Sequence, residues 1–151
     1  MNKSSKRKRC ILIVGDIKDG EHSSNYVAEC FNDIDGVLVL KNNSEKHEMK
    51  LLKTLMKEKP EIIIILTEIK NTKKIHIKAS KELKKFLPTH KHIAKSNKVK
   101  VQNFIINIIN NINIPYCYVE LPKDMDFAEK FNIQSSIIKK IMINLFSEIY
   151  I

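Results

Sequence analysis

Two uninterrupted apolar runs limit what this chain can fold into more than any other feature. One is CILIV at residues 10–14, which ends before Gly15, and the other is IIIIL at residues 62–66, inside the predicted strand EIIIIL at 61–66. Runs of this β-branched type place apolar side chains on both faces of a strand, which is typical of the middle of a parallel sheet covered by helices. They favour an α/β fold over an all-helical or open antiparallel one.

The segments around these runs alternate between strand and helix patterns. Strands are predicted at 10–14, 37–40, 61–66, 74–78 and 115–121, and helices at 24–33, 45–57, 81–86, 99–111 and 135–150. The strand at 74–78 alternates strictly, so it is predicted to be an edge strand or a hairpin partner with one wet face. This order predicts a three-layer α/β sandwich with a short, mainly parallel sheet joined by right-handed crossovers.

Length and hydropathy predict one domain. Residues 1–9 form a basic arm that is predicted to be disordered, and residues 10–151 form a single α/β domain of ordinary size. No window approaches the roughly 18 apolar residues of a membrane span. The apolar run after the arm is too short for a signal peptide, so we expect the protein in the cytoplasm.

Charge and cysteine content narrow the function classes. The formal net charge is +10, from 27 Lys and Arg against 17 Asp and Glu, which permits an acidic protein or nucleic acid as partner. Only 7% of the residues are aromatic, and no aromatic–basic alternation suggests base stacking. Cys10, Cys30 and Cys117 are widely spaced without a CxxC pair, so they are predicted to be small buried residues in a reducing compartment.

Several nucleotide and nucleophile motifs are missing. The loop after the first strand has Gly15 and Gly20 with acids between them, which is no GxGxxG, and neither a P-loop nor a GxSxG elbow occurs. An acidic loop at this place would repel a pyrophosphate. A classical nucleotide-binding fold is therefore disfavoured.

Acids and histidines do occur where the strands of such a sheet end, which is where α/β proteins bind ligands. Glu21 and His22 follow the first strand, Glu68 follows the third, and His90 and His92 lie in a long polar loop. Carboxylate and imidazole together suit nickel or zinc. The alternative is that all of these are solvated surface residues, and the sequence chemistry leaves both open.

Local strings in this order resemble the nickel-iron hydrogenase maturation endopeptidases, which remove the C-terminal extension of a metal-loaded hydrogenase large subunit. The strings are ILIVGD at 11–16, GE at 20–21, VAECF at 27–31, IIIILTEI at 62–69, LPTH at 87–90 and PYCYVELP at 115–122. The resemblance implies the phosphorylase/hydrolase-like fold of that family.

The resemblance also implies a site, a substrate and a partner. Glu21, Glu68 and His90 would ligate nickel, with His22, Thr67 and His92 as alternates. The metal would arrive with the partner, the large-subunit precursor, so no permanently bound cofactor is expected. The first glycine of the family's Gly-x-Gly-Asn is absent, and Asp16 stands where Asn is expected.

These departures leave two readings of the family resemblance: an active metal-dependent endopeptidase or a divergent, inactive relative. The alternative function is a non-catalytic binding module whose basic surface contacts an acidic protein or nucleic acid.

Overall fold

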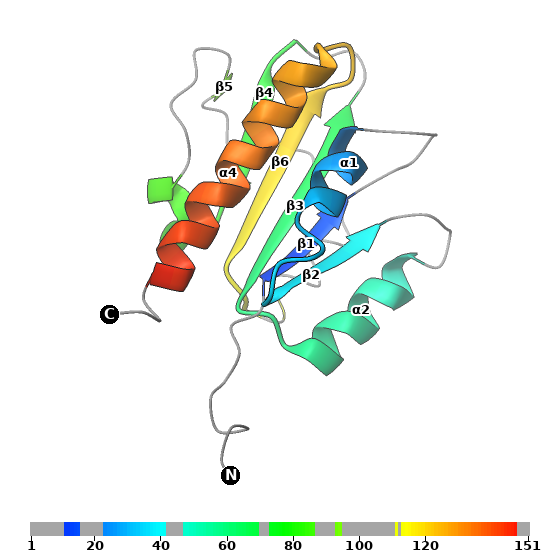
Figure 1. Ribbon diagram of the computed structural model, residues 1–151, viewed down its shortest axis with the longest axis vertical. Coiled ribbons are helices and arrows are strands. Elements are labelled where there is room, and N and C mark those ends of the chain that lie inside the picture. Colours follow the sequence, from blue (N-terminus) through cyan, green and yellow to red (C-terminus); the bar gives the residue numbers. More distant parts are fainter. Residues whose placement is uncertain are drawn as a thin grey trace.

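The computed structural model describes residues 11–15, 23–41, 47–69, 73–86, 93–94, 111 and 113–147. Within these residues lies one six-stranded sheet in the order β2-β1-β3-β6-β4-β5 (Figure 1). The strands are β1 (Ile11–Gly15), β2 (Val37–Lys41), β3 (Ile62–Ile69), β4 (Ile75–Ala79), β5 (Ile93–Ala94) and β6 (Tyr116–Pro122). The first three strands and β6 run parallel, β4 is antiparallel to β6, and β5 is parallel to β4. The mainly parallel sheet is confirmed.

Helices cover both faces of this sheet. They are α1 (Ser23–Cys30), α2 (His47–Glu58), the 3₁₀ helix η2 (Lys81–Phe86) and α4 (Phe127–Ser147). α1 and α4 contact each other and pack on one face, in front of the sheet in Figure 1, which we name the α1/α4 face. α2 packs on the other, which we name the α2 face. The predicted three-layer α/β sandwich is confirmed.

The apolar run in β3 explains why the core has two halves. Ile64 and Leu66 point into the α1/α4 face, while Ile63 and Ile65 point into the α2 face, and all four are at most 1% exposed. Alternate residues of a strand point to opposite faces, so an all-apolar strand serves both halves at once. Each of these side chains contributes about 1.5–3 kcal/mol by its burial.

The end of α2 follows from its local sequence. The helix stops at Glu58, and Lys59 then takes a left-handed conformation with φ of 47°. Its backbone N–H still donates to the carbonyl oxygen of Leu55 at 3.1 Å, and Pro60 prevents any further turn. This is the usual geometry of a helix C-terminus, although glycine is the residue that normally occupies it.

Lys59→Gly is therefore expected to raise the free energy of unfolding by about 0.5–1 kcal/mol, because glycine tolerates the left-handed conformation without strain. Urea unfolding followed by circular dichroism measures the effect. The exposed Lys53 lies in the middle of the helix, so Lys53→Gly should lower stability by about 1 kcal/mol. A loss of stability in both variants would contradict the proposed geometry.

Two element boundaries differ from the prediction. α4 begins at Phe127, two turns before the predicted start at Ser135. Ser135 does not cap a helix: its hydroxyl donates to the carbonyl oxygen of Phe131 at 2.7 Å, which is how a serine is accommodated inside a helix. β3 continues to Ile69 because its last residues pair with the end of β6, so Thr67 and Glu68 lie in the strand and not after it.

The alternation of β4 predicted an edge strand or a hairpin partner. The structure shows neither: β4 is not the outermost strand, and it does not form a hairpin with β3. It pairs with β6, and its first two residues also pair with β5, a two-residue strand in a stretch expected to be loop. The predicted helix at 99–111 lies outside the described residues except for Asn111, and so does the basic arm at 1–9. The single-domain assignment stays a prediction.

Two further expectations concern membranes and thiols. Among the described residues, no helix has the length and apolar character needed to cross a bilayer. Cys117 is buried, as predicted, whereas Cys30 is exposed on α1. Cys10 lies outside the described residues.

Candidate functional site

The strands define one edge of the sheet where a site is expected. The parallel strands β1, β2, β3 and β6 all end there, and the antiparallel β4 begins there. Ligands of α/β proteins bind at such a carboxyl edge. Of the residues predicted to form a site, Thr67 and Glu68 are described near this edge, while Glu21, His22, His90 and His92 lie outside the described residues.

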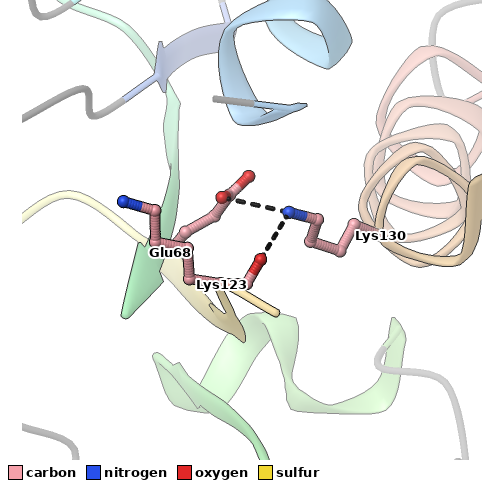
Figure 2. A network of polar contacts seen from close by, with 3 residues as sticks. All are labelled: Glu68, Lys123 and Lys130. Atoms are coloured by element: carbon pink, nitrogen blue, oxygen red, sulfur yellow. Dashed lines mark hydrogen bonds and ion pairs between the residues drawn. The ribbon is translucent and has the colours of Figure 1, made fainter. Parts of the chain in front are cut away.

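Glu68 points into the α1/α4 face, where it meets a lysine from α4 (Figure 2). The ammonium of Lys130 lies 3.2 Å from Oε2 of Glu68 and also donates to the backbone carbonyl oxygen of Lys123 at 3.1 Å. The two side chains of the ion pair are 2% and 9% exposed, with Glu68 the deeper. This network joins the end of β3, the turn after β6 and the first turn of α4.

The predicted metal site is not supported by this arrangement. The positive charge of Lys130 already compensates the carboxylate of Glu68. Thr67, the alternate ligand, precedes Glu68 in the same strand and therefore points to the opposite face. Within the described part of the chain, no three His, Cys, Asp or Glu side chains are grouped so that they could hold an ion.

A second polar group lies on the α2 face, in a row across three strands. Thr67 of β3 is registered with Glu120 of β6, and Glu120 is registered with His76 of β4. Directly opposed residues of neighbouring strands share a face, and across the antiparallel pair of β4 and β6 their Cβ atoms lie about 4.5–5.5 Å apart. We name Thr67, Glu120 and His76 the edge row, because each lies within two residues of the carboxyl edge.

Glu120 is the most unusual member of the edge row because it is an acid that is only 5% exposed. Its burial raises the pKa of its carboxyl group, and two weaker influences lower it: the hydrogen bond from Tyr118 and the charge of His76. The Tyr118 hydroxyl donates to Oε2 of Glu120 at 3.2 Å. A carboxyl group whose pKa is raised toward neutrality, beside an imidazole, is suited to accept and return protons.

This burial predicts a definite pH dependence. The pKa of Glu120 is higher in the folded than in the unfolded chain, so the carboxyl group favours folding below its unfolded pKa of about 4.5 and opposes it as pH rises through the folded pKa. Glu120→Gln should therefore unfold at higher urea concentration than wild type at pH 8, with the difference disappearing near pH 4. Repeating the pair of measurements in a His76→Asn background removes the influence of the imidazole charge on Glu120. A difference in urea stability between the two proteins that does not change with pH would contradict the raised pKa of Glu120.

Sequence reasoning missed the pairing within the edge row and placed Glu120 merely at the end of the last strand. The sequence did show part of this arrangement. His76 lies on the polar side of the alternating strand at 74–78, and Glu120 is the acid near the end of the mostly apolar strand at 115–121. Their juxtaposition depends on β4 pairing with β6, which no local pattern determines.

The described thiols lie away from this row. Cys117 belongs to β6 but points into the core of the α1/α4 face, where burial raises its pKa to about 12. Cys30 ends α1, which returns the chain toward the amino edge of the sheet, where Gly36 bonds to Ile11. A cysteine nucleophile needs a neighbouring base and a lowered pKa. The raised pKa and the burial of Cys117 argue against that role for its thiol.

Comparison with solved structures finds pyrrolidone carboxyl peptidases. The enzyme of Thermococcus litoralis superposes with a TM-score of 0.65 at 12% identity, over 93% of this chain and 96% of that one. A mutant pyrrolidone carboxyl peptidase from Pyrococcus furiosus superposes with a TM-score of 0.60 at 14% identity, over 89% of this chain and 99% of that one. The pyroglutamyl peptidase I of Bacillus amyloliquefaciens superposes with a TM-score of 0.53 at 13% identity, over 91% of this chain and 93% of that one. No protein-family model and no curated protein sequence matches the chain.

At this level of identity the likeness establishes the fold, and it also corrects the family assigned from sequence. Pyroglutamyl peptidases from three organisms share the fold over nearly their whole length, so the resemblance to hydrogenase maturation endopeptidases was wrong. The predicted substrate and partner, a nickel-loaded large-subunit precursor, are wrong with it. The comparisons also give no support to the alternative of a basic surface that binds an acidic protein or nucleic acid.

Proposed function

We propose that this chain removes an amino-terminal pyroglutamyl residue from peptides. The observation that carries the proposal is the extent of the shared fold, which spans 93% of this chain and 96% of the Thermococcus litoralis pyrrolidone carboxyl peptidase. A fold by itself hosts many functions, so the argument also needs a site. The edge row supplies a buried acid and an imidazole at the edge of the sheet where ligands bind.

The substrate itself is compatible with this location. A pyroglutamyl group is a small, uncharged lactam, so it can enter a partly buried site without bringing an unpaired charge. The reaction adds water across one amide bond and needs a group that accepts a proton and a group that donates one. We therefore propose that no resident cofactor is required. The free thiols of Cys30 and Cys117 are consistent with a cytoplasmic location, which we also propose.

The test is hydrolysis of a fluorogenic pyroglutamyl amide of aminomethylcoumarin by the full chain. We expect fluorescence release that exceeds release from the matching alanyl and prolyl amides and that disappears with heat-denatured protein. Equal rates on all three amides would show that the pyroglutamyl group is not recognised. No release from any amide would overturn the hydrolytic proposal.

A second candidate is recognition of the same peptide end without cleavage. The burial and the raised pKa of Cys117 favour it, because they argue against a nucleophilic role for that thiol. Calorimetric titration with a pyroglutamyl peptide, and with the same peptide carrying a free amino-terminal glutamine, separates the two candidates. Selective binding with no product by mass spectrometry supports recognition alone, and product formation excludes it.

A further inference from the structure

An exposed group of aromatic rings lies where the helices α1 and α4 begin. Tyr26 of α1 and Phe127 of α4 meet edge to face with ring centroids 5.9 Å apart, and Phe131 stacks on Phe127 at 6.4 Å. We name these three residues the aromatic patch. Tyr26 is 43% exposed and Phe127 is 51% exposed, so a large part of both rings faces solvent. Apolar side chains grouped in this way on a surface commonly mark a binding site.

The aromatic patch lies at the carboxyl edge of the sheet. α1 follows β1 and α4 follows β6, so both helices begin at the edge where these parallel strands end (Figure 1). Ligands of α/β proteins bind at that edge. The aromatic patch is open to solvent, in contrast to the buried Glu120, so a peptide that approaches this edge can contact it directly.

The charge around the aromatic patch is opposite in sign to that of the whole chain. The formal net charge of the chain is +10. Three exposed carboxylates nevertheless lie within three residues of Phe127: those of Asp124, Asp126 and Glu129. Two lysines share this stretch, but the ammonium of Lys130 already compensates Glu68, and Lys123 offsets only one of the three negative charges. The surface beside the aromatic patch is therefore acidic.

We propose that the aromatic patch binds an arginine or lysine side chain of the peptide whose pyroglutamyl end enters the site. This assignment rests on the proposed function and narrows its substrates to basic pyroglutamyl peptides. A cation is attracted to the face of an aromatic ring, and the planar guanidinium of arginine also stacks on it. Carboxylates beside the rings supply the complementary charge, which an acidic side chain would oppose. The rings and the carboxylates thus favour the same occupant.

Four peptides test this preference. In each, a pyroglutamyl residue is followed by two identical residues (arginine, glutamine, phenylalanine or glutamate) and by an alanine amide. Calorimetry gives Kd, and KM for cleavage serves where a peptide is hydrolysed. We expect the arginine peptide to bind at least about 5-fold more tightly than the glutamine peptide, and the glutamate peptide to bind most weakly. This arginine advantage should shrink as the salt concentration rises, because exposed charges are screened.

Two ring variants locate the effect. Tyr26→Leu and Phe127→Leu each keep an apolar side chain but remove an aromatic face. Each should reduce the arginine advantage, and the combined variant should abolish it. The matched control is Met56→Leu, which changes an exposed apolar residue on α2 and should leave the arginine advantage unchanged. Circular dichroism checks that all of these variants fold.

A charge variant tests the carboxylates independently. Asp124→Asn combined with Asp126→Asn removes two negative charges, and asparagine can still cap the start of α4. The arginine advantage should fall in this variant and lose most of its salt dependence. Asp33→Asn is the control, because Asp33 is an exposed acid in the turn after α1, away from the aromatic patch, and its replacement should have no such effect.

Several results would overturn the assignment while leaving the proposed function intact. One is equal affinity for the arginine and glutamine peptides, and another is an arginine advantage that survives in the combined Tyr26→Leu, Phe127→Leu variant. Tightest binding of the phenylalanine peptide would make the occupant apolar. A dimer in sedimentation that Phe127→Leu dissociates would place a second copy of the chain on the aromatic patch.

A fifth peptide separates this assignment from the proposed function. It carries the two arginines behind an acetyl-alanyl group, which is uncharged like the pyroglutamyl group. Equally tight binding of this peptide, lost in the combined ring variant, would uphold the basic subsite and overturn recognition of the pyroglutamyl end. If the wild-type protein neither binds nor cleaves any of the pyroglutamyl peptides, both proposals are overturned.

Discussion

Lys130→Met is expected to lower the free energy of unfolding by about 3–5 kcal/mol, the largest effect of any single substitution considered for this protein. The reason is the carboxylate that would remain. The side chain of Glu68 is only 2% exposed, and Lys130 provides both its ion-pair partner and a hydrogen bond to the carbonyl oxygen of Lys123. Methionine fills a similar volume but leaves the buried charge uncompensated. Guanidinium unfolding followed at 222 nm measures the difference.

Two controls separate the ion pair from a general effect of losing a lysine. Lys139 is exposed on the same helix, and Lys139→Met should change stability by less than about 0.5 kcal/mol. The double variant Glu68→Leu, Lys130→Met removes both charges and should recover most of the loss, because two apolar groups can replace a buried ion pair at little cost. A double variant as unstable as Lys130→Met would show that the charge of Glu68 is not the cause.

Ile64→Ala should lower the free energy of unfolding by about 2–5 kcal/mol. Ile64 is fully buried in the middle of β3, in the core between the sheet and the helices α1 and α4. Removing three carbon atoms there costs the transfer free energy of the side chain and leaves a cavity that the rigid sheet cannot close. Urea unfolding gives the value, and Ile64→Val, expected at about 0.5–1.5 kcal/mol, serves if the alanine variant does not fold.

The matched control is an apolar residue on a surface. Met56 of α2 is 69% exposed, so Met56→Ala should change stability by less than about 0.5 kcal/mol. Similar losses in Ile64→Ala and Met56→Ala would mean that the proposed difference in burial between the two positions is incorrect.

Much of the fold was predictable from the sequence because a strand that is buried on both faces has an uninterrupted run of apolar residues. The isoleucine run at 62–65 has no polar residue on either face, and the structure buries both sides of it. The start of α4 was not predictable in the same way. Ser135 and Ser136 resemble helix caps in sequence, but a serine inside a helix can satisfy its hydroxyl on a carbonyl one turn earlier, as Ser135 does with Phe131.

The candidate site was less predictable because its contacts join distant segments. Lys130 is 62 residues from Glu68, and nothing in either local sequence indicates that the lysine compensates the acid expected to bind a metal. The edge row likewise requires His76 and Glu120 to meet across β4 and β6. The family resemblance failed for a related reason: apolar strands alternating with amphipathic helices produce similar strings in any fold of this layered type.

The position of β6 at the centre of the sheet has a consequence for how the chain reaches its fold. The ladder between β3 and β6 pairs Ile63 with Tyr116. The chain between them, about 50 residues long, must form a closed loop before this contact can form. Pairing over such a sequence separation slows folding, typically to milliseconds or seconds. Until β6 arrives, one edge of the isoleucine-rich β3 lacks its partner, and such an edge invites pairing with other chains. On the ribosome, therefore, the first half of this protein is the part most exposed to aggregation.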